Sequence, residues 1–137
     1  MLLFKYLGSM STNLTCIAID DDPVFLRKIE AFIEEIPEIV LLESHSNAIK
    51  GATAVIKQKP DILLTDIEMP YTDGFYLIDW LKPKLASMAS PPRIIVISSL
   101  WLKEEELPQQ AAGFINKYDL KEPAILRQML NTLFGDR

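Results

Sequence analysis

The stretch CIAIDDDPVFLRKIEAFIEEI, residues 16–36, contains the two kinds of element from which the chain is built. It begins with a short, continuous apolar run, which is typical of a strand buried on both faces of a parallel sheet. Three aspartates and Pro23 follow, and proline suits the first turn of a helix. From Phe25 onward apolar side chains recur at helical spacing. The stretch therefore predicts a buried strand followed directly by an amphipathic helix.

The same strand-helix alternation recurs along the chain. Continuous apolar runs stand at residues 39–43, 61–65, 93–98 and 113–116. Helical spacing of apolar residues predicts further helices over 47–57, with Asn47 as the N-cap, and over 75–85 and 122–133. Strands that alternate with helices favour right-handed crossovers, because such connections pack back onto a parallel sheet. We expect an α/β fold with a doubly wound, five-stranded parallel sheet.

Composition limits the function. A length of 137 residues with 49% hydrophobic residues suits one domain, predicted over 13–137, with 1–12 as an appended cloning remnant or a flexible N-terminal arm. The net charge of -5 argues against direct nucleic-acid binding, which needs a basic face. The only cysteine, Cys16, indicates a reducing compartment, so we expect a cytoplasmic protein. No apolar run approaches the roughly 18 residues of a membrane helix, and we expect no membrane association.

Polar side chains follow the predicted strands at their carboxyl ends. Aspartates occupy 20–22 after the first strand, Asp66 follows the third, Ser98 ends the fourth and Lys117 follows the fifth. These ends meet at one edge of a parallel sheet, where ligands bind in open α/β folds. Two carboxylates about 4 Å apart repel by on the order of 4 kcal/mol at an effective dielectric of 20, so a cation must offset them.

Lys117 is one such cation, and a bound divalent ion is the other. Oxygen ligands without clustered histidine or cysteine favour Mg²⁺, or Mn²⁺, over Zn²⁺. Such a site suits an incoming phosphoryl group, and a carboxylate beside the ion can act as its nucleophile. We therefore expect phosphoryl-transfer chemistry at this edge of the sheet.

These motifs resemble those of response-regulator receiver domains over nearly the whole of residues 13–133. The family has an acidic pair, an acceptor aspartate followed by Met-Pro and a glycine, a switch hydroxyl and a lysine. The matching residues, in chain order, are Asp20, Asp21, Asp66 with Met69, Pro70 and Gly74, Ser98 and Lys117. Five matched features in the right order make the resemblance specific.

The resemblance implies a CheY-like, flavodoxin-like (βα)5 fold with strand order 2-1-3-4-5. It also implies two-component signalling, in which a histidine kinase or phosphotransfer protein phosphorylates Asp66. Mg²⁺ would be bound by Asp21, Asp66 and the backbone carbonyl of Glu68, with Asp20 acting through water. Such a domain is not an enzyme toward another substrate, although it assists its own phosphorylation and dephosphorylation.

In such domains the hydroxyl, here Ser98, turns toward the phosphoryl group, Lys117 contacts that group, and an aromatic residue on the fifth strand, here Phe114, follows inward. The resulting switch would control an output domain or a partner protein, with a homodimer as a further expectation. The motifs IDDDP and DIEMP are similar to those of receivers joined to LytTR-type DNA-binding domains.

Two departures from the family pattern affect the expected output surface. Tyr118 follows the lysine, where the family usually has proline. The interval from Ser98 to Lys117 is short, and Pro108 interrupts LKEEELPQQAA, because proline in a helix interior removes a hydrogen bond. We expect an abbreviated or irregular fourth helix. Trp101, just after the switch serine, suits either packing or partner contact, whereas Trp80 is expected in the core.

Two other functions remain open. A haloacid dehalogenase-like phosphatase uses similar aspartyl-phosphate chemistry, but it would have a second aspartate two residues after the nucleophile, where this chain has Glu68. Such a phosphatase is also usually longer. A receiver-like interaction module that is never phosphorylated is disfavoured by the intact acidic cluster.

Overall fold

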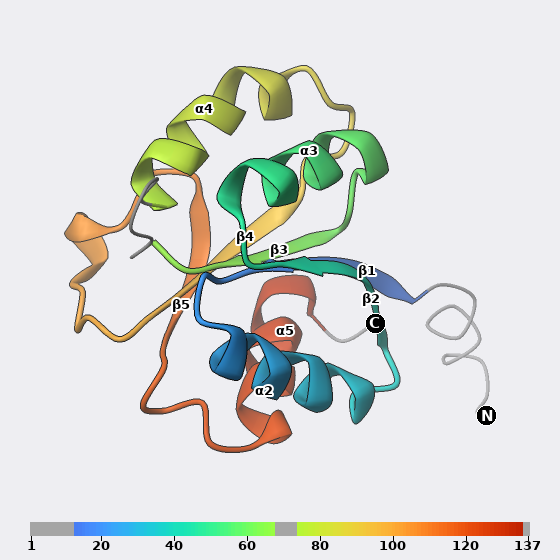
Figure 1. The fold of residues 1–137 in the computed structure, drawn as a ribbon, viewed down its shortest axis with the longest axis vertical. Helices are drawn as coiled ribbons and strands as arrows, with labels where there is room; N and C mark the ends of the chain where they lie inside the picture. The colour runs from blue at the N-terminus through green and yellow to red at the C-terminus, as the bar shows by residue number, and fades with distance from the viewer. Residues whose placement is uncertain (1–12, 68–73, 136–137) are drawn as a thin grey trace.

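The computed structural model describes residues 13–67 and 74–135, which fold as strands alternating with helices (Figure 1). The elements are β1 (Leu14–Ile19), α2 (Pro23–Glu34), β2 (Ile39–His45), α3 (Ala48–Gln58), β3 (Ile62–Thr65), α4 (Gly74–Ala86), β4 (Arg93–Ser98), the short 3₁₀ helix η1 (Glu104–Glu106), β5 (Ala111–Asn116) and α5 (Pro123–Phe134). Every predicted strand and helix is present, with ends shifted by a few residues.

The sheet has the order β2-β1-β3-β4-β5, and neighbouring strands are parallel. Figure 1 shows α3 and α4 on one face of the sheet and α2 and α5 on the other. The two faces bury separate apolar clusters, one centred on residues such as Ile33 and Leu126, the other on residues such as Ile78 and Leu81. The predicted doubly wound, flavodoxin-like fold is confirmed.

Polar side chains start the helices that leave the carboxyl edge of the sheet. The Asp22 carboxylate accepts hydrogen bonds from the N–H groups of Val24 (3.0 Å) and Phe25 (3.4 Å), and Pro23 follows in the first turn of α2. The predicted N-cap Asn47 accepts from the N–H of Lys50 at 2.9 Å. Such caps satisfy backbone donors that have no partner within the helix. Asp22 is thereby committed to starting α2.

The connection between β4 and β5 departs from the regular pattern. Residues 99–110, all of them described, contain only η1 as a helical element. The predicted abbreviated or irregular fourth helix is confirmed, and the chain resumes its strand three residues after Pro108. This segment lies beside β5 at the carboxyl edge (Figure 1).

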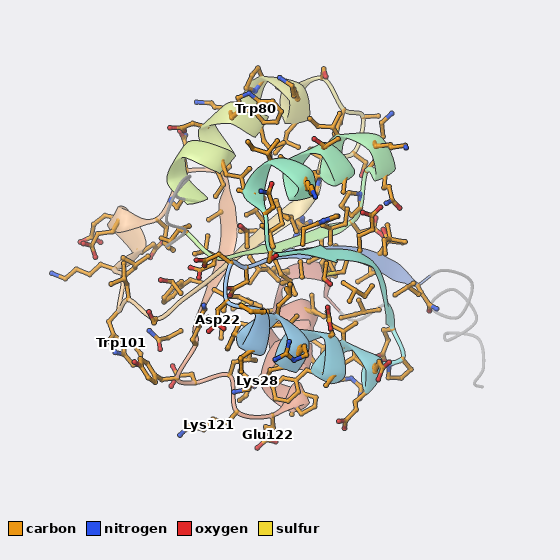
Figure 2. The ribbon with its side chains drawn as sticks, in the orientation of Figure 1. Asp22, Lys28, Trp80, Trp101, Lys121 and Glu122 are labelled. Atoms are coloured by element: carbon orange, nitrogen blue, oxygen red, sulfur yellow. The ribbon has the colours of Figure 1, made fainter. Side chains whose placement is uncertain are left out.

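The core prediction for Trp80 is wrong. Its side chain is 41% exposed and lies on the outer surface of α4 (Figure 2), with Lys84 Nζ 4.3 Å from the centroid of a ring. The buried stripe of α4 consists of Leu77, Ile78, Leu81 and Leu85, which turns position 80 away from the sheet. None of the helices in the described ranges is long and apolar enough to cross a membrane.

Candidate functional site

Three carboxylates converge at the carboxyl edge of the sheet. Asp20 follows β1 and Asp66 follows the adjacent strand β3, where the Asp66 N–H donates to the Ile19 carbonyl at 3.0 Å. One carboxylate oxygen from each of Asp20, Asp21 and Asp66 lies within 4.8 Å of the others. Asp20 and Asp66 are only 1% and 3% exposed, and Asp21 is half-buried. The predicted convergence is therefore present in the structure.

Lys117 reaches into this cluster from the end of β5. Its Nζ donates to Asp66 Oδ2 at 2.8 Å and lies 2.9 Å from Asp20 Oδ2. The same Nζ lies 4.6 Å from the centroid of the Phe25 ring, which approaches from α2. The Lys117 backbone N–H donates to the Ser98 carbonyl at 2.8 Å. Lys117 therefore links the ends of β4 and β5 to the two acids that follow β1 and β3.

The electrostatic environment raises the pKa of both members of the acidic pair. Burial, with a smaller contribution from Asp66, raises the pKa of Asp20 from 3.8 to about 6, although Lys117 and the Asp22 amide act in the opposite direction. Burial and Asp66 also raise the pKa of Asp21. Burial alone would lower the pKa of Lys117, but its bonds to Asp66 and Asp20 outweigh this, so that pKa is raised. One lysine offsets only part of the negative charge.

The acidic cluster also fits a divalent cation. Asp20 Oδ1 accepts from the Asp22 N–H at 2.9 Å. Asp20 Oδ2 has Lys117 Nζ as its ion-pair partner at 2.9 Å, and the same ammonium also bonds Asp66. Carboxylates as buried as these need cationic partners, because a buried charge without one is costly, and a single ammonium is shared between the two acids. Three carboxylates without nitrogen or sulfur ligands match the preference of Mg²⁺ for hard oxygen donors.

The other predicted site residues lie on β4, on β5 and outside the described residues. Ser98 is fully buried at the end of β4, where its Oγ accepts from the Leu100 N–H at 3.1 Å. Phe114 is half-buried on β5, packs on the apolar cluster that includes Val96, and lines a cavity with Trp101. Glu68, the predicted carbonyl ligand, lies outside the described residues, as do Met69 and Pro70.

Asn116, the last residue of β5, was not predicted to belong to the site. Its side chain is 3% exposed, donates to the Leu100 carbonyl at 2.9 Å and accepts from the Tyr118 N–H at 2.8 Å. A polar residue that ends an apolar strand directly before Lys117 was the available signal. Its partners, however, lie in two different loops, which spacing along the chain does not reveal.

The family model for the response regulator receiver domain matches residues 16–130. The chain therefore belongs to the response-regulator receiver family, as its motifs predicted. Domains of this family act in two-component signal transduction and generally bind Mg²⁺ at an acidic pocket. This chain has an acidic cluster of Asp20, Asp21 and Asp66.

Two curated relatives carry similar segments. The transcriptional regulatory protein BtsR of Escherichia coli K12 is 34% identical over 68 residues, which is 50% of this chain and 28% of BtsR. Protein-glutamate methylesterase/protein-glutamine glutaminase 3 of Geobacter sulfurreducens is 34% identical over 83 residues, 61% of this chain and 21% of that protein. The chain spans less than a third of either relative, and their names describe different outputs.

Solved structures support the same fold. In the CheX-CheY-BeF3-Mg complex from Borrelia burgdorferi, the matching chain has a TM-score of 0.77 and 17% identity, with 94% of this chain and 95% of that chain covered. At this level of identity the match concerns the fold alone. The match agrees with the five-stranded parallel sheet of this chain, whose strand order is β2-β1-β3-β4-β5.

Proposed function

We propose that Asp66 is the phosphoacceptor of this receiver domain and takes its phosphoryl group from a phosphohistidine of a sensor kinase or phosphotransfer protein. The observation that carries the proposal is the position of Lys117, whose Nζ contacts Asp66 at 2.8 Å and Asp20 at 2.9 Å. A cation held between two buried acids neutralises charge where a phosphoryl group would arrive. Asp20 also pairs with Lys117, and Asp66 is distinguished from it by its position in the family's acceptor motif.

In the proposed reaction, a carboxylate oxygen of Asp66 forms a bond to phosphorus while the P–N bond to the donor imidazole breaks. The electron pair of that bond goes to the imidazole nitrogen, which takes up a proton from solvent, so the donor leaves as a neutral histidine. Negative charge develops on the oxygens of the phosphoryl group during transfer. The Lys117 ammonium and the Ser98 hydroxyl would stabilise this charge. The Phe25 ring lies against one side of the Lys117 ammonium, with its centroid 4.6 Å from Nζ.

Mg²⁺ would be held by Asp20, Asp21 and Asp66, with the Glu68 carbonyl as the further ligand that family resemblance suggests. When bound, the ion would supply positive charge that stabilises the negative charge on the phosphoryl oxygens. Mn²⁺ has the same preference for oxygen ligands and is the expected substitute. The convergence of three carboxylates, two of which share the single ammonium of Lys117, is the structural feature that supports this assignment.

The proposed output is a conformational switch. An aspartyl phosphate adds negative charge beside Ser98 and Lys117 and would shift the segments that follow β4 and β5 between two arrangements. Phe114 would move with Ser98, and an effector domain or partner protein would bind the altered surface, in a homodimer or a heteromeric complex. The histidine-kinase donor and the buried thiol of Cys16 favour a cytoplasmic location. We expect this domain neither to contact nucleic acid directly nor to catalyse a reaction on an external substrate.

Phosphorylation by a small donor tests the proposal. Wild-type protein incubated with phosphoramidate and Mg²⁺ should gain one phosphoryl group that hydroxylamine removes, as read by intact mass. Asp66→Asn should gain none, because the amide oxygen is a poor nucleophile. Asp79→Asn, which removes an exposed acid on α4, is the matched control and should behave like wild type. An adduct on Asp66→Asn, or none on wild type, would refute the assignment.

A further inference from the structure

The side chain of Asn116 lies between the two segments that frame the proposed phosphorylation site. It is the last residue of β5 and pairs in register with Ser98 at the end of β4. It is 3% exposed, so its amide cannot exchange its partners for water without cost. The next residue is Lys117, which bonds Asp66. Asn116 therefore adjoins both the proposed switch hydroxyl and the proposed phosphate-binding amine.

The amide joins two loops that are otherwise irregular. Nδ2 donates to the Leu100 carbonyl at 2.9 Å, in the segment that follows Ser98. Oδ1 accepts from the Tyr118 N–H at 2.8 Å, in the segment that follows Lys117. The amide has one orientation that satisfies both contacts, because a carbonyl only accepts and an N–H only donates. One side chain thus fixes the backbone two residues beyond Ser98 and one residue beyond Lys117.

An aromatic contact joins the same two loops on the outside. The rings of Trp101 and Tyr118 stack with centroids 6.4 Å apart and an interplanar angle of 16°. Both side chains are about two-thirds exposed, and Figure 2 shows Trp101 on the outer side of the segment between β4 and β5. Stacked rings pack without directed hydrogen bonds, and both rings here are open to solvent. The buried amide is therefore the more specific of the two connections.

The segment between Ser98 and β5 is irregular, although Leu102 and Leu107 pack on the apolar cluster of the face covered by α3 and α4. Residues 99–110 contain only the three-residue η1, which is too short to pack as a helix would. The hydroxyl of Ser98 bonds the Leu100 N–H at 3.1 Å, so a shift of Leu100 would move the proposed switch group as well. Displacement of about 1 Å at such a site costs on the order of a hundredfold in rate.

We propose that Asn116 is a positioning residue for phosphoryl acceptance: its amide ties the Leu100 and Tyr118 backbones together and so holds Ser98 and Lys117 where the phosphoryl group of Asp66 needs them. The inference rests on the proposed function of Asp66. Asn116 itself contacts neither the acids nor the phosphoryl group; it acts through its two neighbours. Because the metal-binding acids are not among its contacts, its removal should change phosphorylation more than Mg²⁺ binding.

Asn116→Leu is the decisive variant, because leucine has the same branched arrangement of side-chain heavy atoms and no hydrogen-bonding group. Phosphorylation by phosphoramidate in saturating Mg²⁺ should slow by about ten- to a hundredfold, measured by intact mass well below the unfolding temperature of each protein. Mg²⁺ affinity, measured separately by the shift in unfolding temperature, should stay close to wild type. A purely structural role would lower the unfolding temperature and leave the rate unchanged.

Thr15→Val is the matched control. The Thr15 hydroxyl also bridges two segments, since it donates to the Asp61 carboxylate at 3.1 Å and accepts from the Asp61 N–H at 3.0 Å, but it lies at the opposite end of the sheet. The Thr15→Val variant should be less stable than wild type but should be phosphorylated at the wild-type rate. A wild-type rate for Asn116→Leu, or an equal loss of rate for Thr15→Val, would overturn the inference.

Asn116→Asp provides a second test if the leucine variant does not fold. It keeps the acceptor for the Tyr118 N–H but has no donor for the Leu100 carbonyl, so an intermediate loss of rate is expected. A wild-type rate for this variant would likewise overturn the inference. Failure of wild-type protein to be phosphorylated on Asp66 would instead overturn the proposed function, so the two failures are distinguishable.

Discussion

Lys117 is the residue on which the charge balance of the site depends. It contacts two buried carboxylates and the ring of Phe25, and it is itself only 16% exposed. Removing one partner of a buried ion pair leaves uncompensated charge, which is more costly than losing an exposed pair. Because Asp20 and Asp66 can also be neutralised by a divalent cation, the importance of the lysine for stability should depend on Mg²⁺.

Lys117→Met should lower the free energy of unfolding by up to about 3–5 kcal/mol in EDTA, because two buried acids lose their counterion. The loss should be smaller in Mg²⁺, and phosphorylation should remain slow in both conditions. Urea unfolding with and without Mg²⁺ measures the difference. Lys121→Met, at an exposed position, is the control and should change stability by no more than about 0.5 kcal/mol. Equal losses for the two lysine variants would contradict the charge-balance argument.

At the scale of the elements, the approach of α3 to β1 sets the position of the acid-bearing strand end. A Cβ atom at Gly51 would lie 2.5 Å from both Cγ1 and Cδ1 of Ile19, the residue before Asp20. Glycine in a helix costs about 1 kcal/mol relative to alanine, so its presence here reflects close packing rather than helix propensity. The helix can lie against the end of β1 only because position 51 has no side chain.

Gly51→Ala should therefore destabilise the domain despite its better helix propensity. The overpacked methyl group should cost about 1–3 kcal/mol, more than the roughly 1 kcal/mol gained in propensity. Thermal unfolding followed by circular dichroism measures the net change. Thr53→Ala, on an exposed face of the same helix, gains propensity and loses only an exposed hydrogen bond to the Ile49 carbonyl, so it should raise stability by a few tenths of a kcal/mol. Stabilisation by both substitutions would show that Ile19 moves aside freely.

Over the whole molecule, the acidic site makes stability depend on pH and metal. The raised pKa values of Asp20 and Asp21 mean that the folded, metal-free protein binds protons more tightly than the unfolded chain. Stability from these two groups is therefore present at low pH and is lost as the pH rises. The raised pKa of Lys117 acts far above this range. A cation at the site would oppose the loss at neutral pH.

Asp20→Asn should remove most of this dependence, because its amide does not titrate. In EDTA, the free energy of unfolding of the variant minus that of wild type should increase as the pH rises from about 4 to 6, the interval between the unfolded and folded pKa values of Asp20, and then level off. Urea titrations across this range measure the slope. A difference that is constant or decreases with pH would contradict the raised pKa.

Local pattern accounts for most of what could be predicted. Runs of apolar residues buried on both sides predicted the five strands, and helical spacing predicted the four long helices and their burial. The convergence of Asp20, Asp66 and Lys117 followed because carboxyl ends of parallel strands share one edge. These features depend on short-range spacing and on one general rule of sheet topology, both of which are readable along the chain.

Only the tertiary structure decided how side chains are shared between loops. It assigned Asp22 to the N-cap of α2, turned Trp80 outward, and brought Asn116 between Leu100 and Tyr118. The bond from Asn116 to Leu100 depends on the relative placement of β4 and β5, and the outward turn of Trp80 depends on which stripe of α4 packs on the sheet, whereas the Asp22 cap is a local contact. The sequence by itself determined which residues stand at the site, and the packed fold determined which groups hold them in place.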